Sequence, residues 1–118
     1  MEHLIRNTGS KVDDQGIALY RRLFANETHV ASALGMMAKW DLSQLKRRLG
    51  ELDVPLVLVV GGQDRAVAPD QAFAVRERAP NAKVILLPGL GHLAHEERPE
   101  EVAEIVVKAA REPLPANA

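Results

Sequence analysis

The sequence predicts an α/β fold in which three short helices precede a β-α-β-α unit with two parallel strands. Up to about residue 52, apolar residues recur at helical spacing, and no run is continuous enough to form a buried strand. The pattern then changes, because the segments at 55–62 and 83–89 are apolar at nearly consecutive positions. A helical segment separates them, and a right-handed crossover of this kind makes the two strands parallel and close in space.

We expect three helices in the first half of the chain. The first lies near 14–25, the second near 27–38, and the third follows Asp41, which forms a capping-box pattern with Gln44. Their apolar faces comprise, in chain order, Tyr20, Leu23 and Phe24; Val30, Leu34 and Met37; and Leu42, Leu45 and Leu49. The first half is therefore predicted to be helical.

Two strands and the helix between them are expected next. The segment PLVLVVGG at 55–62 is rich in β-branched residues, and KVILLPG at 83–89 has a similar character, which suits strands covered on both faces. The intervening helix is expected over 69–79. Its inward-facing residues are predicted to be Ala72, Val75 and Ala79.

The last helix is expected to begin at Pro99, because proline suits the first helical position. Glutamates follow in the first turn, and Lys108 and Arg111 lie near the negative end of the helix dipole. The predicted buried stripe comprises Val102, Ile105, Val106 and Ala109.

Two strands that are apolar on both faces need a larger sheet around them. The chain offers no other convincing strand. We therefore expect either a fragment of a larger α/β domain or a chain that completes its sheet by self-association. The expected organisation is a helical segment at 1–52, a β-α-β-α unit at 53–112 and a frayed tail at 113–118.

Composition excludes several classes of function. The 118-residue chain has a formal net charge of -1, which gives no electrostatic footprint for nucleic acid or an anionic membrane. It has no cysteine, so disulfides and thiolate metal sites are excluded. The longest apolar run, PLVLVV, is far shorter than the roughly 20 residues of a membrane span, and the first residues lack a signal-peptide apolar region. A cytoplasmic location is the default expectation.

Two ionisable residues follow the predicted strands. Asp64 comes after the first strand through Gly61-Gly62-Gln63, and His92 comes after the second through Gly89-Leu90-Gly91. Ligands of parallel sheets bind at the carboxyl ends of the strands, so both side chains are expected at one edge. An aspartate that binds one imidazole nitrogen leaves the other nitrogen to act as a base. An ordinary turn aspartate and a loop histidine are the plainer alternatives.

At these residues the sequence resembles a known family. VPLVLVVGGQDRAVAP, followed 28 positions after Asp64 by the histidine of LPGLGHLAHEERPEEV, is similar to the C-terminal part of the α/β-hydrolase fold. The order Asp then His also matches that family. The resemblance implies a partial α/β-hydrolase fold with a helical cap at 1–52, in which Asp64 is the triad acid and His92 the general base. It implies no metal and no organic cofactor.

Motifs in the first half narrow this resemblance. LIRNTGS, LYRRLF and HVASALGMMAKWDL are similar to the magnesium-chelatase-associated α/β-hydrolases of bacteriochlorophyll biosynthesis, and the likeness runs from about residue 3 to 110. It implies a role in tetrapyrrole synthesis, with magnesium chelatase as a partner. The implied substrate is a small molecule, an ester or a tetrapyrrole.

The chain departs from the family at the nucleophile. That residue lies in a G-x-S-x-G turn between a strand and a helix, and none of Ser10, Ser32 and Ser43 has this setting. The oxyanion loop that precedes this turn is missing as well. We therefore expect the chain to begin inside the cap and to lack esterase activity by itself. The alternative is a non-catalytic accessory or tetrapyrrole-binding module, because a fold does not determine a function.

Other candidate side chains have two interpretations each. Met36, Met37 and Trp40 could line a substrate pocket under the cap, or they could be packing residues of the cap itself. His95 follows His92 at a spacing that matches no zinc signature, so His95, Glu96 and Glu97 are predicted to cap and solvate the start of the last helix. Arg6 and Lys11, near Gly9-Ser10, are predicted to be solvated rather than to bind an anion.

Overall fold

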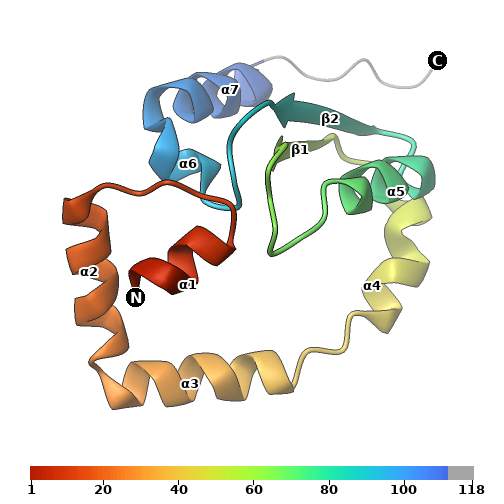
Figure 1. Ribbon diagram of the computed structural model, residues 1–118. Coiled ribbons are helices and arrows are strands. Elements are labelled where there is room, and N and C mark those ends of the chain that lie inside the picture. The colour runs from red at the N-terminus through yellow and green to blue at the C-terminus, as the bar shows by residue number, and fades with distance from the viewer. Residues whose placement is uncertain (112–118) are drawn as a thin grey trace.

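The computed structural model describes residues 1–111 (Figure 1). Its elements are α1 (Glu2–Asn7), α2 (Asp14–Phe24), α3 (Glu27–Ala38), α4 (Ser43–Arg48), η1 (Leu49–Glu51), β1 (Leu56–Gly61), α5 (Asp70–Arg78), β2 (Ala82–Leu87), α6 (Ala94–Glu97) and α7 (Pro99–Arg111). The predicted α/β fold is confirmed, whereas the tail expected at 113–118 lies outside the described residues.

The two strands form a parallel pair. Leu56 of β1 lies opposite Ala82 of β2, and the register continues to Gly61 opposite Leu87. Helix α5 connects the strands and packs against β2 (Figure 1). Since both strands point the same way, the loops that follow Gly61 and Leu87 leave the sheet at the same edge.

A small apolar core lies where the end of β2, its following loop and the two last helices meet. Leu87, Leu90 and Ala94 are buried there, and Val59, Ile85, Val102 and Ile105 pack against them. Val106, which the helical periodicity predicted to be buried, is exposed, so that prediction is wrong. The packed stripe of α7 is narrower than predicted because only one apolar residue in each of its first turns reaches this core.

Three short elements were not expected from the sequence, namely α1, η1 and α6. Each has six residues or fewer, too few for apolar periodicity to indicate a helix. The predicted capping box of the third helix is also wrong. Helix α4 begins at Ser43, so its N-cap position is Leu42. Asp41 lies one position before the cap and accepts the Ser43 backbone N–H over 3.0 Å.

Helices α2, α3 and α4 follow one another around the outside of the molecule (Figure 1). Asp13 and Asn26 cap the first two by accepting backbone N–H groups of Gly16 and His29. Helix α2 packs against α3. Much of the predicted apolar surface of these helices is exposed, including Leu23, Phe24, Leu34, Met37, Leu42 and Leu45. Met36 and Trp40 are exposed as well. None of the helices within residues 1–111 has the length and apolarity needed to cross a bilayer.

Three glycines allow three loops to meet at the carboxyl edge of the sheet. A Cβ atom on Gly9 would overlap the carbonyl oxygen of Gln63, and one on Gly61 would lie 2.6 Å from the carbonyl oxygen of Leu90. A Cβ on Gly91 would overlap the backbone between Gly9 and Ser10. We call this contact of the loops around Gly9, Gly61 and Gly91 the glycine junction.

The glycine junction yields a stability prediction. The variant Gly91→Ala is expected to destabilise the chain by about 2 kcal/mol or more, because backbone rather than a flexible side chain occupies the space of the new methyl group. Gly35→Ala is the matched control. Apart from its chain neighbours and the backbone of its own helix, no atom lies within 4 Å of its new methyl group, and alanine in the interior of α3 should stabilise by about 0.5–1 kcal/mol. Urea unfolding followed by circular dichroism measures both, and equal effects would contradict the prediction.

Candidate functional site

Asp64 lies in the tight turn that follows β1. Its backbone N–H donates to the carbonyl of Gly61 over 3.2 Å. Its carboxylate Oδ1 accepts the backbone N–H groups of Ala66 and Val67, each at 2.8 Å. The side chain is only 9% exposed. The turn therefore shields the carboxylate and occupies one of its oxygens, which leaves Oδ2 for another donor.

His92 lies in the loop that follows β2, and it supplies that partner. Gly89, at φ 80, turns the chain after the strand. The imidazole Nδ1 of His92 then lies 2.8 Å from Oδ2 of Asp64, while the ring remains 41% exposed. The structure thus brings together the two residues that sequence analysis singled out at this edge.

The pKa of the Asp64 carboxyl is lower than its ordinary value. Burial alone would raise this pKa, but the Val67 N–H, the His92 side chain and the Ala66 N–H together outweigh it by stabilising the carboxylate. Asp64 is therefore ionised near neutral pH and accepts a hydrogen bond from His92 Nδ1–H. Nε2 of His92 forms no hydrogen bond within residues 1–111, so it is available to take a proton from another molecule.

The residues that follow α1 have a role that the sequence did not indicate. The Thr8 carbonyl accepts backbone N–H groups from both candidate loops, Arg65 at 3.0 Å and His92 at 3.3 Å. Ser10 is 2% exposed, and its Oγ accepts the Leu93 N–H over 2.8 Å. We call Thr8–Lys11 the bridging segment, because it contacts the loops of both Asp64 and His92. Its short Thr-Gly-Ser run was the available signal, since small residues permit close backbone approach.

Two adjacent glutamates in α6 make contacts with earlier parts of the chain. Glu97 accepts the Gly91 N–H at 2.7 Å through Oε1 and the Lys11 N–H at 3.1 Å through Oε2. Glu96 accepts the hydroxyl proton of Tyr20, which lies on α2. The prediction that these residues mainly solvate the start of α7 is therefore wrong. They belong to a separate short helix that Arg98 ends before Pro99.

The other charged candidates remain near the surface. Nε2 of His95 lies 3.6 Å from Oε1 of Glu96, and the imidazole is 62% exposed. No group of three or more His, Asp or Glu side chains in residues 1–111 is arranged to hold a metal ion. Arg6 pairs with Glu2 on the exposed surface of α1, at 2.7 Å.

A cavity of about 490 Å³ adjoins the acid–base pair. It follows β1 from Val57 to Gly61 and includes Asp64, His92 and His95, with α5 residues on another side. Its size lies within the range of small-molecule sites. Met36, Met37 and Trp40 are not among its lining residues and are exposed on and after α3, so their place in a pocket stays a prediction.

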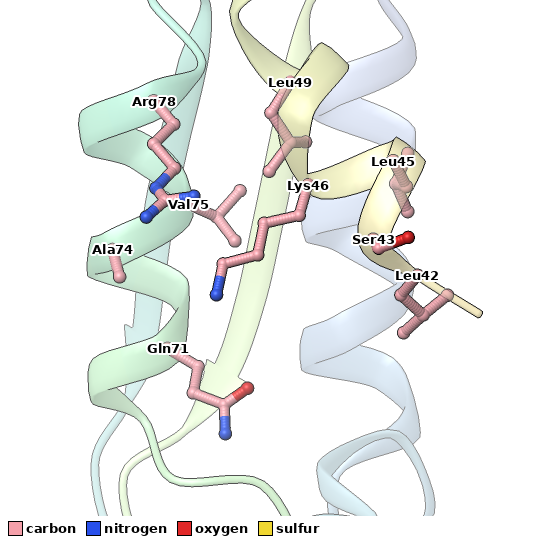
Figure 2. Close-up of a pocket in the computed structure, with 9 residues that line it drawn as sticks. All are labelled: Leu42, Ser43, Leu45, Lys46, Leu49, Gln71, Ala74, Val75 and Arg78. Carbon is pink, nitrogen blue, oxygen red and sulfur yellow. The ribbon is translucent and has the colours of Figure 1, made fainter. Parts of the chain in front are cut away.

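A second cavity, of about 610 Å³, lies between α4 and α5 (Figure 2). Lys46 and Arg78 extend into it from the two helices, beside Val75 and Leu49. Neither Asp64 nor His92 lines it. The larger cavity is therefore separate from the acid–base pair, and the smaller one is the candidate site.

Comparison with known proteins indicates the family to which the chain belongs. The model of the alpha/beta hydrolase family matches residues 6–105. The chain is also similar to the magnesium-chelatase 30 kDa subunit of Rhodobacter capsulatus, with 37% identity over 93 residues. The match covers 79% of this chain and 32% of that protein, so the chain spans about a third of the length of this relative.

The contact between Tyr20 and Glu96 predicts a loss of stability at high pH. Burial, the hydrogen bond to Glu96 and the charge of Glu96 raise the pKa of Tyr20 from 10.0 to about 12. A group with a raised pKa stabilises the fold fully below its unfolded value, and this contribution is lost as the pH rises from 10 toward 12.

We therefore expect the unfolding free energy of the unchanged chain to fall more steeply between about pH 9 and pH 11 than that of Tyr20→Phe. Urea unfolding at both pH values measures the two slopes. Tyr20 is the single tyrosine of the chain, so tyrosinate absorbance reports its ionisation directly. Equal slopes, or ionisation centred at the ordinary value, would contradict the prediction.

Proposed function

Because this chain belongs to the alpha/beta hydrolase family, we propose that Asp64 and His92 are the acid and base of an acyl-hydrolase site. The observation that carries the proposal is the 2.8 Å contact between His92 Nδ1 and Asp64 Oδ2, in a pair that lines the cavity along β1. No serine of this chain lies in a G-x-S-x-G turn. The nucleophile is therefore proposed to come from outside these 118 residues.

We propose a task for each residue of the pair. Asp64 holds the proton of His92 on Nδ1, so that the Nε2 lone pair faces the nucleophile. Nε2 takes the hydroxyl proton as the oxygen attacks the acyl carbon, and ionised Asp64 stabilises the resulting imidazolium. The imidazolium then gives its proton to the leaving group. In the second half of the cycle His92 removes a proton from water as the water oxygen attacks the acyl carbon. The imidazolium then returns this proton to the nucleophile oxygen as its bond to the acyl carbon breaks and the acid product leaves.

The remaining parts of the proposal concern the helices. We place the cap at 1–52 and the hydrolase core at 53–112, with the bridging segment as one of the parts of the first region that contact the core. Met36, Met37 and Trp40 are proposed to contact an apolar part of the substrate. Their exposure leaves them accessible for that contact, and methionine side chains adapt to irregular apolar ligands.

A second candidate function is an accessory role with magnesium chelatase. Its support is the relative of Rhodobacter capsulatus, whose name describes it as a subunit of that enzyme. In this role the hydrolase scaffold would hold a tetrapyrrole or a partner protein, and the reaction at His92 would not be required. In this accessory role, the chain is proposed to serve bacteriochlorophyll synthesis.

A chimaera tests the hydrolase proposal. In it, this chain replaces the matching part of the Rhodobacter capsulatus protein, which restores a chain of hydrolase length. We expect it to hydrolyse p-nitrophenyl acetate, whereas this chain alone does not. Asp64→Asn should lower kcat by about 10³–10⁴-fold, because an amide favours the wrong imidazole tautomer, and His92→Ala should lower it at least as much.

The matched control is His29→Ala, which removes an exposed histidine of α3 away from the pair and should leave kcat within about twofold. A folded chimaera without turnover, or turnover that survives His92→Ala, contradicts the proposal.

The accessory role predicts binding that does not depend on the base. Affinity-tagged chimaera is expected to retain purified magnesium-chelatase subunits of Rhodobacter capsulatus, and His92→Ala should retain them equally well. An untagged-resin control measures non-specific retention. If the unchanged chimaera retains no subunit above this control, the accessory role is wrong.

A further inference from the structure

The geometry points to Glu97 as a positioning residue for His92, an inference that rests on the proposed function of the Asp64–His92 pair. Glu97 does not contact the imidazole in the structure. It acts on the backbone that carries the imidazole, through the Gly91 N–H at 2.7 Å.

Three successive backbone N–H groups around His92 each have a different acceptor. The Gly91 N–H donates to Glu97 Oε1, the His92 N–H to the Thr8 carbonyl and the Leu93 N–H to Ser10 Oγ. Donors in consecutive peptide units fix the orientation of each peptide plane. The backbone of His92 is therefore held on both sides, and Glu97 is the only ionisable side chain among the three acceptors.

Glu97 also connects this loop to the bridging segment. Its second oxygen accepts the Lys11 N–H at 3.1 Å. One carboxylate therefore contacts Lys11, 86 positions before Glu97, and Gly91, 6 positions before it. Thr8 and Ser10, the other two acceptors, lie in the same segment. Rotation of the carboxylate would break one of its two hydrogen bonds. The loop of His92 and the bridging segment would then no longer be joined through Glu97.

A carboxylate is required because two donors point at one side chain. An ionised glutamate accepts at both oxygens, whereas a glutamine offers one acceptor oxygen and a donor NH₂ group. Glu97→Gln keeps the shape of the side chain but leaves either Gly91 or Lys11 without its acceptor. Hydrogen bonds to a charged acceptor are also stronger than neutral ones, so the substitution weakens the remaining contact.

Glu96→Gln is the matched control. It removes the same charge one residue away, but Glu96 contacts Tyr20 and His95 instead of Gly91. A general electrostatic effect on His92 would appear in both variants. A positioning effect would appear in Glu97→Gln alone.

The first measurement is the tautomer of His92 in the 118-residue chain, from imidazole ¹⁵N chemical shifts assigned with His92→Ala. We expect the Nδ1–H tautomer to predominate in the unchanged chain. Glu97→Gln should lower the ratio of this tautomer to the other by about threefold, and Glu96→Gln should leave it unchanged. Equal ratios in the two variants would overturn the inference.

Asp64→Asn separates this inference from the proposed function. If Asp64→Asn leaves the tautomer ratio unchanged, the acid–base pair itself is wrong. If Asp64→Asn lowers the ratio and Glu97→Gln does not, the pair stands and Glu97 is not its positioning residue. In the chimaera, Glu97→Gln should lower kcat about tenfold with KM within about twofold, because misorientation affects the reaction step more than binding.

A measurement on the unchanged chain decides the case if Glu97→Gln does not fold. Couplings across the hydrogen bonds should join the carboxylate carbon of Glu97 to the amide nitrogens of both Gly91 and Lys11, because both donate to the same carboxylate. Absence of either coupling would overturn the inference.

Discussion

Close backbone contact at the glycine junction is the constraint on which the acid–base pair depends. Parallel pairing of β1 and β2 only sets the loops of Asp64 and His92 on the same edge of the sheet. The 2.8 Å contact between the side chains joins loops that approach more closely than a Cβ atom at Gly61 would permit, and a Cβ atom at Gly91 would overlap the bridging segment. The backbone N–H groups of Gly91, His92 and Leu93 then need acceptors outside the sheet, because a buried donor without a partner costs free energy of folding. The bridging segment and Glu97 supply them.

The parts of the site that could be predicted are those with a local signal. Asp64 and His92 each follow a continuous apolar strand through glycine, and the crossover rule places both strand ends together. Ser10 and Glu97 have no such signal. Their partners are 83 and 86 positions away, and those partners are backbone N–H groups, which every residue except proline possesses. A pattern of residue types cannot distinguish which of them will be contacted.

The longer elements of the fold could also be predicted, because each has a local signal in the sequence. Both strands and helices α2, α3, α5 and α7 have runs or periods long enough to identify them, and the structure places their bounds close to those expected. Periodicity indicates which face of a helix is apolar, but it does not identify what that face packs against. Val106 lies on the predicted stripe of α7 and remains exposed, as do Leu34 and Met37 on α3. Burial depends on neighbours that a single helix does not specify.

Helix α6 links the helical region to the base, although it has only four residues. Its two glutamates contact different parts of the chain. Glu96 binds Tyr20 of α2, whereas Glu97 binds the bridging segment and the loop of His92. A displacement of the bridging segment would therefore act through Glu97 on the backbone that carries His92, whereas Glu96 holds α2 against α6 without contacting that backbone. The proposed cap and the proposed base are thus joined through the bridging segment. The residues proposed to position His92 therefore come from both ends of the chain, whereas its partner Asp64 lies in the turn that follows the neighbouring strand.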